Sequence, residues 1–133
     1  MVPVKATIDA RLVARVRSKI LKEFETMRQT LDTEDIGIEI TLALSDEEIE
    51  KLVMMALREA QRPISWREFK QIFAGIVGED RLRRILANLK ARDIIVELTR
   101  TRYSLPEYVP VSEISKVKNP RVLSKVLRRT TIQ

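Results

Sequence analysis

Cysteine and histidine are both absent from this sequence of 133 residues. Their absence excludes disulfides, thiolate chemistry and the usual zinc sites, and it removes the side chain that most often moves protons near neutral pH. An enzyme would depend on Asp, Glu, Lys, Ser, Thr or Tyr, yet the sequence contains no recognisable nucleophile–base arrangement or phosphate-binding loop. We therefore expect a protein that is not an enzyme and that uses no cofactor and no metal.

Long apolar runs and aromatic residues are also scarce. No run of 18 apolar residues occurs, and the first ten residues lack a secretory apolar region, so we expect a cytoplasmic protein without a membrane span. Few aromatic residues are present, three Phe, two Tyr and one Trp, which disfavours RNA or single-strand binding. The lack of Cys, the scarcity of Asn and Gln and the heavy use of Arg, Glu and Ile are typical of a thermophile.

Charge is unevenly distributed along the chain. Basic residues number 25 and acidic residues 19, a net charge of +6, with a pI near 9.9, which favours a polyanionic partner. The segment from Asp32 to Glu59 carries nine acidic and only two basic residues, whereas the rest of the chain is net basic. This acidic segment is a candidate surface for a basic protein partner.

The first third of the chain predicts a long helix followed by an extended segment. After Asp9, a suitable cap, apolar residues recur at a spacing close to 3.6 as far as Leu31, which indicates an amphipathic helix. Such a helix either packs on its own domain or pairs with a second subunit. Residues 36–44 alternate strictly between apolar and other residues and predict a strand or extended arm. We assign residues 1–44 as a candidate dimerisation region.

Two helix starts are marked by the same device. Ser45 with Glu48 and Ser65 with Glu68 form S-x-x-E capping boxes, which predict helices from residue 46 to about 60 and from 66 to about 74. Gly75 to Gly78 makes a turn, and a third helix runs from residue 79 to about 92. Two helices joined by so short a connection are a helix-turn-helix candidate.

The third helix has clearly separated faces, and a hairpin follows it. The predicted buried stripe is Leu82, Ile85, Leu86 and Leu89. Arg84, Ala87 and Ala91 point away from it, with Arg83, Asn88, Arg81 and Lys90 on the flanks. At Asp93 the period changes to two, which predicts a hairpin with a four-residue loop about Arg100 and with Ile94, Val96 and Leu98 facing the core.

The end of the chain is basic. A proline-punctuated connection follows Pro106, and Asn119 with Pro120 predicts the start of a short amphipathic helix. From Lys116 onward the chain has six basic and no acidic residues. This end is therefore either a second electrostatic contact or a partly disordered tail.

The order of elements over residues 46–105, above all LRRILANLKARDIIVELTRTRYSL, resembles a winged-helix domain of archaeal and bacterial transcription regulators. The usual Gly between recognition helix and wing is Asp93 here, and no subfamily is identified. The resemblance implies a mainly α fold with a small β-hairpin wing. It places a winged helix-turn-helix domain at residues 45–106, with the long N-terminal helix added before it and a basic C-terminal extension with a short helix at 107–133.

The resemblance makes residues 79–92 the recognition helix and residues 100–102 the wing tip. A helix entering the major groove needs small residues where its backbone approaches, and long donors beside them. The candidate DNA contacts are Arg67, Lys70, Arg81, Arg83, Arg84, Ala87, Asn88, Lys90, Ala91, Arg100 and Arg102. Since Arg, Ala and Lys are strong helix formers, the same face also fits a merely solvated helix. Trp66 and Tyr103 fit core positions better than base stacking.

The leading hypothesis is a homodimeric transcriptional regulator that binds double-stranded DNA, with the first helix or the C-terminal helix as the subunit seam. The alternative is a winged helix used for protein docking in a replication, transcription or chromosome-maintenance assembly, because one fold hosts both functions. The acidic segment supports that alternative. A metal site in the acidic run from Asp46 to Glu50 is disfavoured, because a capping box and the helix dipole explain the run.

Overall fold

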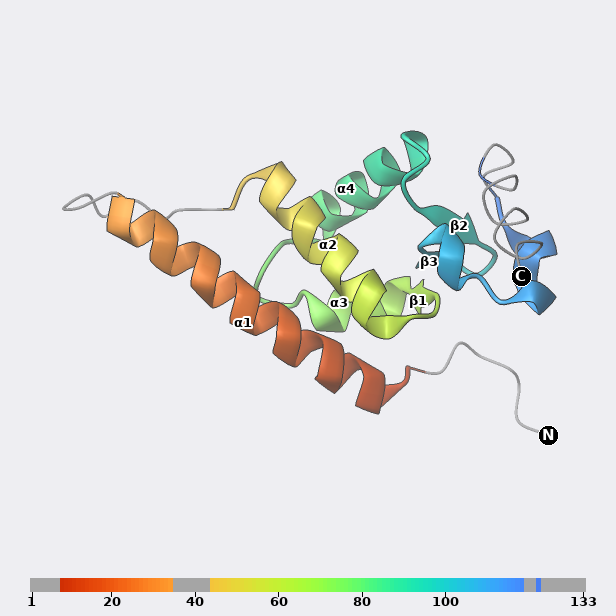
Figure 1. Cartoon of the computed structure of the whole chain (residues 1–133), viewed down its shortest axis with the longest axis horizontal. Helices are drawn as coiled ribbons and strands as arrows, with labels where there is room; N and C mark the ends of the chain where they lie inside the picture. The colour runs from red at the N-terminus through yellow and green to blue at the C-terminus, as the bar shows by residue number, and fades with distance from the viewer. Residues whose placement is uncertain (1–7, 35–43, 119–121, 123–133) are drawn as a thin grey trace.

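The computed structural model of the chain describes residues 8–34, 44–118 and 122 (Figure 1). It is mainly helical with a small antiparallel sheet, which confirms the expected class at that level. The helices and strands are α1 (Ala10–Glu34), α2 (Asp46–Ala60), β1 (Ile64–Ser65), α3 (Trp66–Ile72), α4 (Glu79–Ala91), β2 (Val96–Leu98) and β3 (Arg102–Ser104), followed by the 3₁₀ helices η1 (Pro106–Tyr108) and η2 (Val111–Lys116).

Two predicted elements fall largely outside the described residues: the strand over residues 36–44, of which Leu44 is described, and the short C-terminal helix, of which Val122 is described. Within the described part of the chain, no helix is long and apolar enough to cross a membrane.

Helix α1 packs on the rest of the molecule along its first half. The Asp9 carboxylate accepts a hydrogen bond from the Leu12 amide at 3.1 Å, so the predicted cap is present. Figure 1 shows α1 running past α2 and α3. The Arg17 guanidinium donates to carbonyls at the end of α3, including that of Ile72 at 2.8 Å. The first of the two interpretations, a helix packed on its own domain, therefore holds for the fully buried residues as far as Ile20, and Phe24 and Met27 pack half-buried against the same core. The buried residues of this half are Leu12, Val13, Val16 and Ile20.

Both predicted capping boxes form. Ser45 accepts from the Glu48 amide at 3.2 Å and Glu48 accepts from the Ser45 amide at 2.8 Å. Ser65 and Glu68 make the same reciprocal pair at 3.2 and 3.0 Å. Each cap stabilises its helix by about 1 kcal/mol. The predicted turn after α3 is also present, with Gly75 at a φ of +81°, where glycine carries no steric penalty.

The three strands pair in the order β1-β3-β2, all antiparallel. Ile64 in β1 pairs with Tyr103, and Leu98 in β2 pairs with Arg102. The hairpin loop is therefore three residues long rather than the predicted four. The loop is tighter because Arg100 and Thr101 adopt left-handed backbone conformations, with φ of 66° and 52°, which residues other than glycine rarely take.

The hairpin buries residues on both faces, and this corrects the predicted single core face. Ile95 is buried in the main core, whereas Ile94 is only half-buried. Val96 and Leu98 belong to a second small cluster with Val109 and Val122. Successive residues of a strand point to opposite sides, so β2 separates the two clusters.

The chain after β3 covers the outer edge of β2. Leu98 forms a bridge with Val117, and the backbone amide of Lys118 donates to the Glu97 carbonyl at 2.7 Å. The Thr99 amide donates to the Lys116 carbonyl at 3.1 Å. These bonds satisfy backbone groups that an open sheet edge would expose. Residues 116–118 therefore lie beside the hairpin.

Candidate nucleic-acid interface

Helix α4 presents the face that the sequence predicts. Its apolar stripe, from Leu82 to Leu89, is buried against the core, and the residues opposite are exposed. Of the candidate contacts on all elements, the exposed ones are Arg67, Arg83, Arg84, Ala87, Asn88, Ala91 and Arg100, and the half-buried ones are Lys70, Arg81, Lys90 and Arg102.

Trp66 joins three of the elements that carry these residues. It is the first residue of α3, and the Arg83 guanidinium of α4 lies over its half-buried ring, 4.7 Å from the ring centre. Its backbone amide donates to the carbonyl of Thr101, in the hairpin loop, at 2.9 Å. The start of α3, α4 and the hairpin tip thus meet at one residue, α4 through the Trp66 ring and the hairpin through the Trp66 backbone amide. The sequence favoured a core position for Trp66, and its half-buried side chain does pack against the main core. The contact with Arg83 was not predicted.

Basic residues stand next to this junction in each of the three elements. Arg67 follows Trp66 directly, and Lys70 lies one helical turn further along the same side of α3. Arg84 is adjacent to Arg83, and Arg100 is adjacent to Thr101. Neither Arg83 nor Arg84 forms an ion pair with a carboxylate in the described residues. We call the set Arg67, Lys70, Arg83, Arg84 and Arg100 the basic surface.

Three other candidate contacts already have carboxylate partners. Arg81 pairs with Asp46 at 2.8 Å and also donates to the Leu44 carbonyl. The Lys90 ammonium lies 2.7 Å from Glu97. Arg102 pairs with Glu113 of η2, also at 2.7 Å. A nucleic acid would have to share these cations with the chain's own carboxylates, so they are weaker candidates than Arg83 and Arg84.

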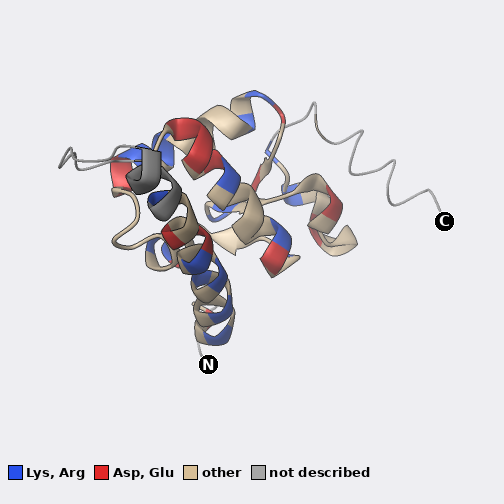
Figure 2. Cartoon of the chain, turned by 60° about the vertical axis from the view of Figure 1, so that its left-hand side comes forward, with Lys and Arg blue, Asp and Glu red and all other residues tan. Residues whose placement is uncertain are grey.

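The acidic start of α2 faces basic residues of α4 (Figure 2). Besides the Arg81–Asp46 pair, Arg92 lies 2.7 Å from Glu50. Arg81 and Arg92 are eleven residues apart, about three helical turns, and Asp46 and Glu50 are four apart, so both pairs join facing sides of two helices. The sequence did not predict the Arg92–Glu50 pair, because this contact depends on how α2 and α4 pack against each other.

These ion pairs weaken the interpretation of the acidic segment as a surface for a basic protein partner. Asp46 and Glu50 are bound to α4, and Glu59 pairs with Lys19 at 3.0 Å and with Arg15 at 3.6 Å. The described carboxylates that the sequence offers to a basic partner are thus partly neutralised inside the chain. Among the described residues, no group of three or more acidic side chains is arranged to hold a metal ion.

A buried glutamate fixes the start of α3 beside the basic surface. The Glu68 carboxylate accepts the Ser65 and Asp9 amides, each at 3.0 Å, and the Arg62 guanidinium at 3.1 Å. Burial alone would raise the pKa of Glu68, but these hydrogen bonds and the charge of Arg62 outweigh it and lower the pKa. The ionised carboxylate therefore ties α1 and α3 together.

Tyr103 packs under the junction. Its ring meets that of Phe69 edge to face, with the centres 6.0 Å apart, which fixes the hairpin on α3. Tyr103 is buried, so its predicted core position is confirmed. Burial raises the pKa of Tyr103, and Glu97 raises it further, while the charge of Arg83 partly offsets both. Arg83 therefore acts on Tyr103 as well as on Trp66.

Comparison with protein-family models, with curated proteins and with solved structures finds no match to this chain.

Proposed function

We propose that residues 45–106 form a winged-helix domain and that this domain binds duplex DNA. The element order α2, β1, α3, α4, β2, β3 and the strand order β1-β3-β2 support the fold. In this proposal α4 enters the major groove, and the β2–β3 hairpin is a short wing whose tip contacts the backbone. A wing of three-residue strands reaches only the nearest phosphates.

The observation that carries the proposal is the convergence at Trp66 of α3, α4 and the hairpin tip. Each of the three elements brings at least one residue of the basic surface to the junction. A solvated helix face does not require that three elements carrying basic residues converge on one residue. A polyanion that spans these elements would bind all of them at once.

The exposed face of α4 suits close approach to bases. Ala87 and Ala91 keep it low, while Arg84 and Asn88 project beside them. Asn pairs with adenine through two hydrogen bonds and Arg pairs with guanine in the same way. We therefore assign base contacts to Arg84 and Asn88, and phosphate contacts to Arg67, Lys70 and Arg100.

We further propose that the protein is a homodimeric transcriptional regulator. The packing of α1 limits which part of this helix could form the subunit interface. As far as Ile20, the inward face of α1 is buried in its own domain. A seam through α1 would therefore use later turns, where Phe24 and Met27 are only half-buried against the chain's own core. Two-fold pairing would place two α4 helices about one duplex turn apart. The molecular mass in solution tests this part alone.

Protein docking, the alternative function, has lost part of its support. It depends on an acidic surface directed at a basic partner, yet Asp46 and Glu50 are held by α4. DNA binding does not require an accessible acidic surface on α2.

The test is a gel-shift titration of the full chain with a duplex of mixed sequence. We expect Arg83→Ala combined with Arg84→Ala to weaken binding by about a hundredfold, since each arginine contributes about 1–3 kcal/mol. Lys22→Ala combined with Lys51→Ala is the matched control, because both lysines are exposed, lie on α1 and α2, and change the net charge equally. An equal loss of duplex affinity in both double variants would mean that binding depends only on the net charge of the protein, and it would contradict the proposal.

A further inference from the structure

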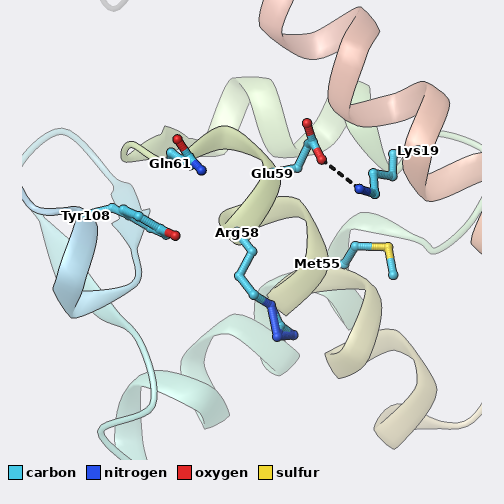
Figure 3. A pocket seen from close by; sticks show the side chains of 6 residues that line it. All are labelled: Lys19, Met55, Arg58, Glu59, Gln61 and Tyr108. Atoms are coloured by element: carbon cyan, nitrogen blue, oxygen red, sulfur yellow. Dashed lines mark ion pairs between the residues drawn. The ribbon is translucent and has the colours of Figure 1, made fainter.

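A cavity of about 510 Å³ opens between α1, the last turn of α2 and η1 (Figure 3). Its volume lies within the range of small-molecule sites, about 300–1,000 Å³. It is separate from the basic surface, because no residue of α3, α4 or the hairpin lines it. The lining residues are Lys19, Met55, Arg58, Glu59, Gln61 and Tyr108.

The charge of the cavity is positive. Glu59 is its one lining carboxylate, and Lys19 at 3.0 Å and Arg15 at 3.6 Å both pair with it. Arg58 is exposed and forms no ion pair with a carboxylate in the part of the chain that the structure describes. Its guanidinium therefore remains available to an anion, and a guanidinium matches a carboxylate through two parallel hydrogen bonds.

The opposite wall is aromatic and is held in place by the backbone. Tyr108 is half-buried against the core, and its amide donates to the Leu105 carbonyl at 3.0 Å within η1. Figure 3 shows its hydroxyl end pointing toward α2. Met55, also half-buried, adds a polarizable thioether that suits contact with an aromatic ring.

Gln61 adds a neutral polar group to the rim. It ends α2 in a left-handed conformation, with φ of 55°, and its amide donates to the Leu57 carbonyl at 3.1 Å. Figure 3 shows its side chain between Tyr108 and α2. The cavity thus combines one cation that no described carboxylate neutralises, two apolar surfaces and one amide, a mixture typical of ligand sites.

We propose that this cavity binds a small aromatic carboxylate, with the carboxylate on Arg58 and the ring between Tyr108 and Met55. The proposal does not depend on DNA binding, since the cavity and the basic surface share no residue. A ligand bound in this way would touch both α2 and η1, so it would stabilise their packing as any ligand of the folded state does.

Calorimetric titration of the full chain with 2-naphthoate tests the proposal. We expect one site per chain, at least about tenfold weaker binding for Arg58→Gln, and unchanged binding for Lys51→Gln. Lys51 is a matched control because it lies two turns earlier on the same side of α2, is exposed and does not line the cavity. The neutral 2-naphthamide should bind at least about tenfold more weakly than the carboxylate, because it lacks the charge that Arg58 recognises.

Methyl NMR of the four methionines locates the ligand independently of affinity. The Met55 signal should shift with added 2-naphthoate, and that of Met27, on the distal part of α1, should stay in place. Three results would overturn the proposal: no heat of binding up to millimolar 2-naphthoate, equal affinity for the wild type and Arg58→Gln, or an unmoved Met55 signal at saturation.

Discussion

The guanidinium of Arg83 lies over the ring of Trp66, 4.7 Å from its centre. A partly exposed contact of this kind stabilises by about 0.5–1 kcal/mol. That is enough to hold Arg83 near one orientation, but a phosphate or a base edge that bonds the guanidinium competes with it easily. In the free protein, Trp66 therefore keeps Arg83 in place at the junction of α3, α4 and the hairpin.

The Trp66 contact makes DNA binding visible in the protein's own fluorescence. Trp66 is the sole tryptophan of the sequence, so its emission reports on this junction alone. We expect added duplex to change the intensity or wavelength of emission as Arg83 turns to the DNA, and Arg83→Ala to remove most of that change. An equal change in Arg83→Ala at saturation would show that Arg83 does not move.

Paired and unpaired arginines of α4 should behave differently. Arg84→Ala should weaken duplex binding by about tenfold, equivalent to about 1.4 kcal/mol. Arg92→Ala should change binding by no more than about twofold, because Arg92 is engaged by Glu50 at 2.7 Å, and should instead cost about 0.2–1 kcal/mol of unfolding free energy. Gel shifts and urea unfolding measure the two quantities. A larger binding loss for Arg92→Ala would mean that the Glu50 pair opens on DNA.

Two glycine substitutions at the hairpin tip should distinguish an effect on stability from an effect on DNA binding. Arg100 adopts a φ of 66°, and glycine tolerates that conformation without the steric cost of a side chain, about 1 kcal/mol. Arg100→Gly should therefore raise the unfolding free energy by several tenths of a kcal/mol or more while it weakens DNA binding. Thr101→Gly, at a φ of 52°, should stabilise without loss of binding. If Arg100→Gly left binding unchanged, the tip would not contact DNA.

Glu68 makes stability depend on pH. Because folding lowers the pKa of Glu68, the ionised carboxylate stabilises the fold above the ordinary glutamate pKa, about 4.3. That stability is lost as pH falls from there through the lower folded pKa. Glu68→Gln should cost about 2 kcal/mol at pH 7 and flatten the acid limb of the stability curve. The exposed Glu47→Gln is the control for urea unfolding from pH 7 to pH 3. A parallel acid limb in Glu68→Gln would assign the pH dependence to other groups.

Local signals in the sequence predicted much of the fold. Capping boxes and the i, i+3, i+4, i+7 stripe of α4 depend on residues within one or two turns of each other, and both are present. The Asp93 position was also informative: Asp93 takes a φ of 59°, the conformation that makes glycine usual at such a place, and aspartate tolerates it better than most residues.

Contacts between distant residues were not predictable in this way. The Arg92–Glu50 pair, the Trp66–Arg83 stacking and the strip from Lys116 to Lys118 along β2 each depend on how whole elements pack. Ile95 shows the same limit. Alternation predicted which side of the strand Ile95 faces, but both sides of β2 are covered. Alternation therefore did not distinguish buried from exposed residues. The sequence thus predicted which residues of α4 are exposed, but not which of its arginines are already paired.

The salt dependence of duplex affinity tests the central claim most directly. If the basic surface binds phosphates and bases, log K for the wild type should fall linearly with log salt. Arg83→Ala with Arg84→Ala should weaken binding at every salt concentration and reduce the slope by up to about 0.9 for each arginine that meets a phosphate. Affinity that does not change between low and moderate salt, or that is the same in wild type and double variant, would contradict the account.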